Sequence, residues 1–266
     1  FLSGFTITLN RSTVTVMRLA FTSSVLCTLL SFSALAQTDH WESVILQGDT
    51  WSYLVPTTQP TSDWVQSGFD DSSWNQGATG IGYGDDDDQT VIENSISLYL
   101  RMEFTLVAVA EIDQLLLDMD YDDGFVAHLN GTEIARSLVS GEPPAFDQPS
   151  DGLHEAMLYT GVDPERWEID PSLLVDGTNL LAIEVHNESL TSSDMSAIPF
   201  LSVGVNSTNY HYRSVPDWFD EPTQMEEIIL ETSNLPIVIV DTEGGQGIPD
   251  EPKIGATMKI IDNGRS

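Results

Sequence analysis

Four aspartates lie close together at the end of a predicted strand, in a pattern suited to a cation. Asp118, Asp120 and Asp122 alternate along the chain, and Asp123 follows directly. Alternate side chains of an extended strand share one face at a spacing of about 7 Å. Carboxylates that close either repel one another or share a hard cation. The four aspartates are therefore candidate ligands of a structural calcium ion, and the alternative is a solvated strand end.

The same segment does not match an EF-hand. Residues 118–124 begin like the calcium-binding loop of that motif, but the glycine comes one position late. Leu129 occupies the position where the motif requires a bidentate glutamate. A calcium ion at these aspartates therefore needs a different set of ligands.

Two histidines and a glutamate form a second candidate group. His128 and His186 each alternate with apolar residues within a predicted strand, and Glu184 precedes His186 by two positions. This spacing predicts that the three lie on a common outer face. In a lectin-like groove such groups bind sugar hydroxyls, while a Trp or Tyr ring stacks on the sugar. We regard them as candidate carbohydrate-binding residues; the alternative is surface strand residues without a ligand.

The sequence lacks the familiar motifs of hydrolases. It has no Gly-x-Ser-x-Gly elbow, and His154-Glu155 lacks the second histidine of a His-Glu-x-x-His zinc motif. With 42 acidic residues, carboxylate pairs suited to glycoside hydrolysis arise by chance and have no diagnostic value. We therefore predict a non-catalytic protein.

Short strands must position these candidate residues. Residues 97–106 alternate between apolar and polar side chains, which predicts a strand with one solvated face. No stretch shows the 3.6-residue period of a long helix. The number and spacing of the strands predict an all-β fold, an antiparallel β-sandwich or jelly roll. The other predicted strands cover residues 43–47, 51–55, 112–119, 125–130, 179–186 and 200–205.

The composition excludes several kinds of partner. The 266 residues include 42 Asp and Glu but nine Lys and Arg, giving a formal net charge of -33. A surface of this sign repels nucleic acid, anionic lipid and other copies of the chain, so we expect a monomer that does not bind nucleic acid. Cys27 is the single cysteine, which excludes an internal disulfide and a zinc ribbon.

The N-terminal segment has the pattern of a secretory leader. Met17 and Arg18 precede an apolar stretch, and Ala34-Leu35-Ala36 fits signal-peptidase cleavage after Ala36. The stretch is short for a bilayer span, and no stop-transfer charges follow it. We expect translation to start at Met17, residues 1–16 to be upstream sequence, and the product to be extracellular without a membrane span.

Three segments within residues 37–208 resemble one known fold family. They read WVQSGFDDSSWNQGATGIGYG at 64–84, YDDGFVAHLNG at 121–131 and DGTNLLAIEVHN at 176–187. Together they are similar to the galactose-binding-like jelly roll, an accessory domain of many secreted glycoside hydrolases and adhesive proteins. The resemblance implies a tight corner at residues 69–74 and a hairpin closed by Asn130-Gly131. We interpret Trp64 and Trp74 as corner and core residues.

The C-terminal segment resembles a second family. Residues 233–264 are similar to the opening of the CotH kinase domain, a secreted kinase-like fold first associated with spore-coat proteins. Residues 235–241 and 253–261 within it are predicted strands. The nucleotide- and metal-binding residues of that family lie downstream of this opening and have no counterpart here. The resemblance implies that residues 233–266 are the truncated start of an incomplete α+β domain, reached through a linker at 209–232.

Three hypotheses for the function follow. The first is a non-catalytic secreted module of a CotH-family protein that binds an extracellular glycan or cell-surface polysaccharide, or positions its parent on a surface. The second is a purely structural or adhesive spacer. The third is an accessory domain that presents substrates to a secreted atypical kinase whose catalytic part is missing from this chain.

Overall fold

The computed structural model describes residues 38–84 and 87–222 in full, together with the backbone of four short strands. β1 (Val14–Val16) pairs antiparallel with β2 (Leu30–Phe32), and β16 (Ile237–Asp241) with β17 (Thr257–Ile261). The chain divides into two compact units, residues 1–220 and 221–266. Apart from these strand pairs, the predicted leader and the CotH-like segment lie outside the described residues.

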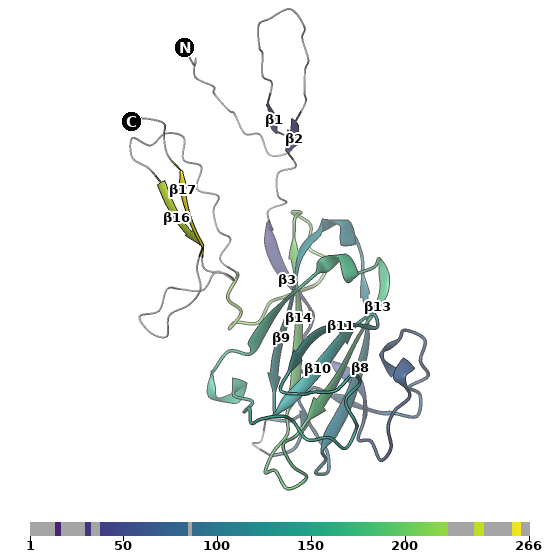
Figure 1. The fold of residues 1–266 in the computed structure, drawn as a ribbon. Coiled ribbons are helices and arrows are strands. Elements are labelled where there is room, and N and C mark those ends of the chain that lie inside the picture. Colours follow the sequence, from purple (N-terminus) through teal and green to yellow (C-terminus); the bar gives the residue numbers. More distant parts are fainter. Residues whose placement is uncertain are drawn as a thin grey trace, which may run out of the picture. The chain divides into compact units, whose positions relative to one another are not determined.

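Two antiparallel sheets form the body of the chain, residues 38–222 (Figure 1). This arrangement is an antiparallel β-sandwich and confirms the predicted all-β class. Sheet I has the strand order β11-β10-β13-β8-β4-β5, and sheet II has the order β12-β9-β14-β3-β15. Sheet I consists of β4 (Thr50–Leu54), β5 (Asn75–Ala78), β8 (Ser97–Leu106), β10 (Gly124–Leu129), β11 (Thr132–Ser137) and β13 (Gly177–His186). Sheet II consists of β3 (His40–Ile45), β9 (Ile112–Tyr121), β12 (Glu165–Ile169), β14 (Ala197–Val205) and β15 (Arg213–Ser214).

The remaining elements of the body are short. β6 (Ile81–Gly82) and β7 (Thr90–Val91) form a small parallel pair of their own. The helical segments among the described residues are 3₁₀ turns: η1 (Ser62–Val65), η2 (Val109–Glu111), η3 (Leu158–Thr160) and η4 (Pro171–Leu173). In this part of the chain no helix has both the length and the apolar character needed to cross a membrane.

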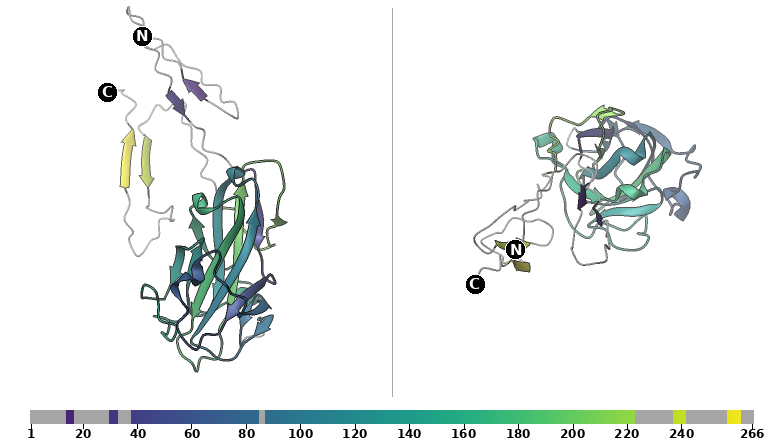
Figure 2. Two further views of the ribbon diagram at one scale, coloured as in Figure 1. Left: turned by 90° about the vertical axis from the view of Figure 1, so that its right-hand side faces the viewer. Right: turned by 90° about the horizontal axis from the view of Figure 1, so that it is seen from above.

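The space between the sheets is filled by side chains on the inward faces of the long strands. These strands run alongside one another in Figure 1 and in the left-hand view of Figure 2. On β8, Leu98, Leu100 and Leu106 are at most 1% exposed, as their alternation predicts. Ile183 and Val185 of β13 are fully buried beside them. Each buried aliphatic side chain contributes about 1.5–3 kcal/mol relative to an exposed one, so this interior is the main source of stability.

The outer face of sheet I is also covered, in contrast to the prediction. Tyr99 and Arg101 lie on the outer side of β8 and are 0% and 2% exposed. A corner at residues 61–74 folds over them, and the rings of Trp64 and Tyr99 pack with centroids 4.9 Å apart. The prediction of a solvated face is wrong for this half of β8, because its cover comes from a distant part of the chain.

Residues 209–220 cover part of the outer face of sheet II. Phe219 is 8% exposed and packs on Trp41, with ring centroids 5.4 Å apart. The buried carboxylate of Glu42 accepts hydrogen bonds from the backbone N–H groups of His211 and Tyr212. The first part of the segment that we expected to be a linker therefore belongs to the sandwich, whose compact unit ends at residue 220.

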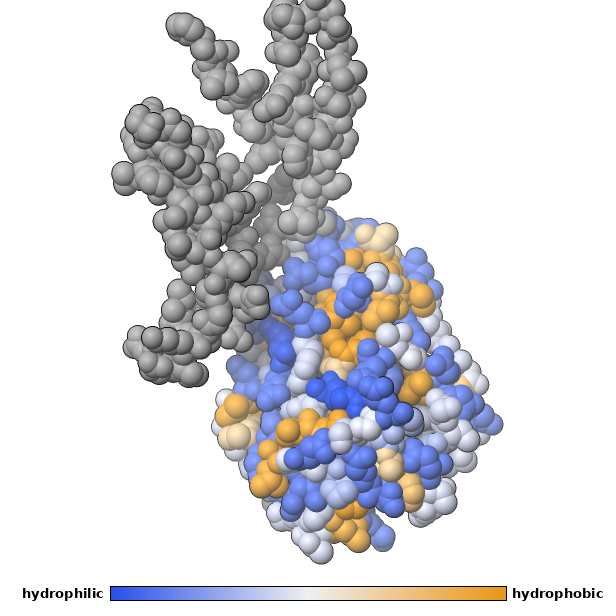
Figure 3. Space-filling model, in the orientation of Figure 1, coloured by the Kyte–Doolittle hydropathy of each residue, from blue (hydrophilic) through white to orange (hydrophobic). Residues whose placement is uncertain are grey.

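On the face shown in Figure 3, hydrophobic residues gather in one area in the upper part of the body, and elsewhere they form small groups separated by hydrophilic residues. The most exposed large apolar side chains are Val91, Leu153 and Tyr210, which lie in different segments. Single exposed apolar residues of this kind are normal on soluble proteins.

Candidate functional site

The structure places His128, His186 and Glu184 on the outer face of sheet I. In the antiparallel pair of β10 and β13, Ala127 lies opposite Ile183, and both belong to the core. Since side chains alternate along a strand, the three candidate residues point away from the core. The spacing in the sequence thus located their face.

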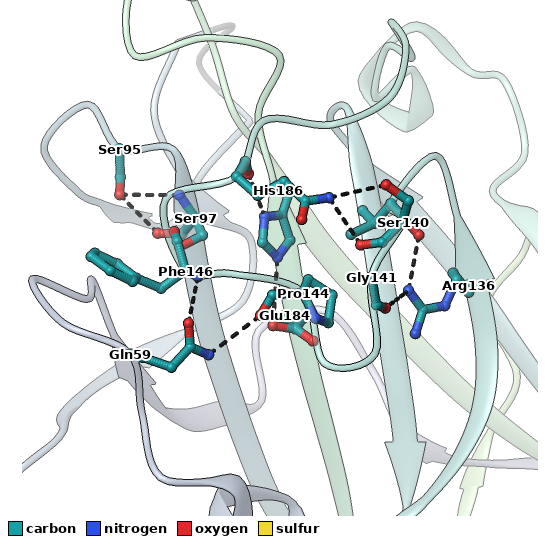
Figure 4. A network of polar contacts seen from close by, with 12 residues as sticks. Gln59, Ser95, Ser97, Arg136, Ser140, Gly141, Pro144, Phe146, Glu184 and His186 are labelled. Atoms are coloured by element: carbon teal, nitrogen blue, oxygen red, sulfur yellow. Dashed lines mark hydrogen bonds and ion pairs between the residues drawn. The ribbon is translucent and has the colours of Figure 1, made fainter.

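A loop at residues 140–148 covers part of this face (Figure 4). His186 is fully buried and Glu184 is 2% exposed. Nδ1 of His186 lies 2.8 Å from the carbonyl oxygen of Gln148, and Nε2 lies 3.5 Å from Oε2 of Glu184. His186 is therefore enclosed by protein, whereas the sequence led us to expect it in an open groove.

Polar contacts hold the loop in place at several points (Figure 4). The backbone N–H of Phe146 donates to Oε1 of Gln59 at 2.8 Å, and Nε2 of Gln59 donates to the carbonyl oxygen of Pro144 at 3.4 Å. The hydroxyl of Ser97 donates to the carbonyl oxygen of Phe146 at 2.5 Å. The side chains of Gln59 and Ser97 thus hold the loop through its backbone.

Arg136 of β11 ties the other end of the loop to the sheet. Its Nε and Nη2 donate to the two carboxylate oxygens of Glu133 at 2.8 and 2.7 Å. Its Nη1 donates to the carbonyl oxygens of Val139 and Gly141, each at 2.9 Å. The contact with Arg136 lowers the pKa of the Glu133 carboxyl. Four of the five N–H donors of a guanidinium are thereby engaged.

The loop, the corner at 61–74 and the strands of sheet I line a half-open cavity of about 250 Å³. His128 and Glu184 both line it, whereas His186 does not. The full lining consists of Ser62, Trp64, Val65, His128, Glu133, Arg136, Glu142, Pro143, Pro144 and Glu184. Two of the three residues singled out by the sequence therefore meet at one cavity, beside a tryptophan.

His128 is uncharged at neutral pH in these surroundings. Burial lowers the pKa of its imidazole from the ordinary value of 6.5. Its Nδ1 is buried and has no hydrogen-bond partner among the residues that the structure describes. The ring lies edge-on to Trp64, with centroids 6.0 Å apart. His128 therefore lines the cavity with a neutral ring whose buried Nδ1 has no partner among the described residues.

A buried arginine that the sequence pattern assigned to solvent holds the tryptophan wall of the cavity. Nη1 of Arg101 donates to the carbonyl oxygens of Trp64 and Gln66, and its Nε donates to Asp71 at 2.9 Å. The guanidinium also lies 5.1 Å from the ring centroid of Phe69. No local signal distinguishes Arg101 from an exposed arginine on a strand, so only the fold reveals its role.

Two of the four candidate calcium ligands have partners of their own. Asp118 pairs with Arg166, whose Nε lies 2.6 Å from Oδ1. The carboxylate of Asp120 accepts hydrogen bonds from the backbone N–H groups of Met157 and Leu158 at 2.8 and 3.0 Å. Burial raises the pKa of both aspartates. Their oxygens are committed to protein donors, in contrast to the predicted sharing of one cation.

Asp123 connects two loops at the end of β9. Its carboxylate accepts hydrogen bonds from the backbone N–H groups of His154, at 2.9 Å, and Glu188, at 2.7 Å. At 2% exposure, this side chain is a structural cap for both loops. The carboxylate of Asp123 is thus engaged by a backbone donor from each of the two loops.

Asp122 alone of the four joins a group of acids. One carboxylate oxygen from each of Asp122, Glu155 and Asp194 lies within 4.8 Å of the others. Calcium takes oxygen ligands at about 2.3–2.6 Å, so three oxygens at this separation can contact one ion. Burial, together with the charges of Asp123 and Asp194, raises the pKa of Asp122 to about 8. Glu155 and Asp194 come from separate loops, and no spacing in the sequence pointed to them.

A buried asparagine fixes the loop that carries Asp194. Asn187 is fully buried, and its Nδ2 donates to the hydroxyl of Tyr83 at 3.0 Å and to the carbonyl oxygen of Asp194 at 2.6 Å. The backbone of Tyr83 in turn exchanges hydrogen bonds with Met195, each of 2.9 Å. The Asp194 loop is therefore attached to the body on two sides.

Comparisons with known proteins find structural neighbours but no family. No protein-family model matches the chain, and neither does any curated protein. A β-glucuronidase from Bacteroides uniformis is similar over 62% of this chain and 18% of its own, with 17% identity and a TM-score of 0.40. A Faecalibacterium prausnitzii β-glucuronidase is similar over 63% of this chain and 32% of its own, with 14% identity and a TM-score of 0.38. The chain thus spans less than a third of the length of either protein.

Proposed function

We propose that the body is a secreted, non-catalytic module that binds carbohydrate. The observation that carries this proposal is the cavity of about 250 Å³, where His128 and Glu184 lie beside Trp64. It is smaller than the roughly 300–1,000 Å³ of sites for drug-sized ligands, so it suits a single sugar ring at the end or on a branch of a glycan.

The chemistry of the lining supports a sugar as the occupant. A sugar ring has hydroxyls that require hydrogen-bond partners and C–H groups that pack on aromatic rings. Glu184 offers carboxylate oxygens, and the imidazole of His128 lines the cavity beside it. Trp64 supplies the apolar wall. His186 acts here as a positioning residue, through its contact with the carbonyl oxygen of Gln148.

The proposal also covers the cellular location of the protein and the kind of parent protein that contains the module. We infer export from the leader pattern ending at Ala36, and a CotH-type parent protein from residues 233–264. The galactose-binding-like resemblance agrees with the sandwich architecture. A periplasmic or extracellular location of the native protein, established by fractionation, is the expected result. Retention in the cytoplasm would contradict the export proposal.

Glycan-array binding tests the function. Purified residues 37–266 should bind a subset of glycans, and His128→Ala should weaken that binding about tenfold or more, the equivalent of one lost hydrogen bond of 1.4 kcal/mol. His211→Ala is the matched control, because this histidine lies near sheet II and contacts Glu111. Equal losses in both variants would contradict binding at the cavity.

Two other roles give different results in the same assay. A structural spacer binds no glycan at all. An accessory domain of a kinase binds peptide or protein substrates, and its parent gene encodes nucleotide- and metal-binding residues downstream of residue 266. A parent sequence without those residues removes the kinase alternative.

A further inference from the structure

We propose that the cavity selects a sugar that carries a protonated amine, a glucosamine-type residue with a free amino group. This inference rests on the proposed carbohydrate-binding function and names the class of sugar. It is carried by the charges that line the cavity and by the hydrogen bonds that these groups have already made.

The lining is negatively charged. Glu133, Glu142 and Glu184 supply three carboxylates, and Arg136 supplies a single positive charge. The remaining titratable group, His128, is uncharged near pH 7 because burial lowers its pKa. Glu133 and Glu142 are exposed, whereas Glu184 is buried. The carboxylate of Glu184 therefore attracts a cation, and repels an anion, more strongly than in bulk water, because less water separates the charges.

The one cation of the lining cannot serve an acidic sugar. Arg136 has its Nε and Nη2 on the carboxylate of Glu133 and its Nη1 on two loop carbonyl oxygens. A uronate, sulfate or phosphate group would have to displace Glu133 from this bidentate contact, which is the strong form of an ion pair. The cavity is therefore unsuited to anionic sugars.

Glu184 is the natural partner of an ammonium group. Its side chain is 2% exposed, and the ring nitrogen beside it, Nε2 of His186, is 3.5 Å away. Nδ1 of His186 faces the carbonyl oxygen of Gln148 at 2.8 Å and therefore carries a hydrogen. The Tyr99 hydroxyl lies close to Glu184 on the protein side. A charged donor in the cavity would add an ion pair to these protein contacts of a buried carboxylate.

Binding of short oligosaccharides to residues 37–266 tests the inference. The ligands are disaccharides and trisaccharides of glucosamine, of N-acetylglucosamine and of glucose, measured by calorimetry at pH 6. The glucosamine series should bind at least tenfold more tightly than the other two. Glu184→Gln removes the charge at nearly constant size and should abolish this preference.

Controls separate the cavity from the general negative charge of the protein. Glu168→Gln makes the same change on an exposed residue of sheet II and should leave the preference intact. Glu142→Gln alters the exposed rim of the cavity, and its partial loss of preference is the second readout if Glu184→Gln fails to fold. Trilysine, a cation without a sugar ring, should bind at least tenfold more weakly than the glucosamine trisaccharide.

The outcomes distinguish this inference from the function on which it rests. Equal binding of the three sugar series, unchanged in Glu184→Gln, overturns the amine inference and leaves the carbohydrate module standing. The amine inference is also overturned if Glu168→Gln loses as much of the glucosamine preference as Glu184→Gln does, or if trilysine binds as tightly as the glucosamine trisaccharide. Attraction to the whole acidic surface then explains the result. No binding to any sugar overturns both proposals.

Discussion

At the scale of single residues, the carboxyl of Asp122 has the most unusual surroundings in the body. It is 3% exposed, and the charges that act on it come from Asp123, Asp194 and Glu155. Its pKa of about 8 in the folded chain lies above the ordinary value of 3.8. The folded chain therefore keeps a proton that the unfolded chain releases, so this residue's contribution to stability decreases as the pH rises from about 4 to about 8.

Asp122→Asn should remove this pH dependence. The amide stays neutral, so the variant should gain stability relative to the parent as the pH rises from 5 to 8, measured by urea unfolding in EDTA. Asp217→Asn, on an exposed residue, is the control and should follow the parent at every pH. A parent and an Asp122→Asn variant with parallel pH profiles would contradict the raised pKa.

A divalent cation bound at Asp122 should stabilise the folded chain at high pH, where the carboxylate alone destabilises it. We predict that millimolar calcium raises the melting temperature of the parent at pH 8 and that EDTA reverses the effect, because a ligand held only by the folded chain stabilises it by mass action. Asp194→Asn should lose most of the gain, whereas Asp118→Asn, which alters an aspartate paired with Arg166, should retain it. An unchanged melting temperature in the parent would end the calcium hypothesis.

At the scale of elements, the predictability of a strand depended on its place in its sheet. The seven strands that the sequence predicted within the two large sheets correspond to β3, β4, β8, β9, β10, β13 and β14, all of which have a neighbour on each side. The four edge strands, β5, β11, β12 and β15, were not predicted. Edge strands are short and polar as a protection against pairing with other chains, so they lack the apolar alternation by which inner strands are found.

The candidate site, too, could be predicted only as far as local alternation of side chains reaches. Alternation within β10 and β13 was enough to place His128 and Glu184 on one face. The loop at 140–148 and the corner at 61–74, which turn that face into a cavity, follow from contacts between distant segments. Arg101 makes such contacts, because its partners Asp71 and Trp64 lie 30 and 37 positions earlier in the chain. A local pattern carries no information on pairs of this separation.

Arg101→Met should loosen the corner more than it disturbs the core. The substitution keeps much of the apolar stem but leaves two carbonyl oxygens and Asp71 without their donor, which should cost about 3 kcal/mol of unfolding free energy. Arg213→Met, which breaks the more exposed pair with Asp49, should cost about 1 kcal/mol or less. Chemical denaturation measures both. Similar losses in the two variants would contradict a special role for Arg101 in holding the corner.

At the scale of the whole molecule, net charge opposes the compact state. A formal charge of -33 on 266 residues gives a strong mutual repulsion, which is screened once the Debye length falls from about 30 Å at 0.01 M salt to about 8 Å at 0.15 M. Added salt should therefore stabilise the chain by about 1 kcal/mol or more, a rise in melting temperature of roughly 2–4 °C per kcal/mol. Sodium and potassium chloride should act alike, and a melting temperature independent of both would contradict this account.

The complete burial of Asn187 has a consequence for producing the protein. Asn187-Glu188-Ser189 is an acceptor sequence for N-linked glycans, which eukaryotic secretory cells attach to chains that have not yet folded. A glycan on Asn187 would occupy the space of Tyr83 and the Asp194 loop, and the modified chain would be unable to close its sandwich. Hosts that do not attach such glycans, such as common bacterial expression strains, are therefore the suitable sources of native material.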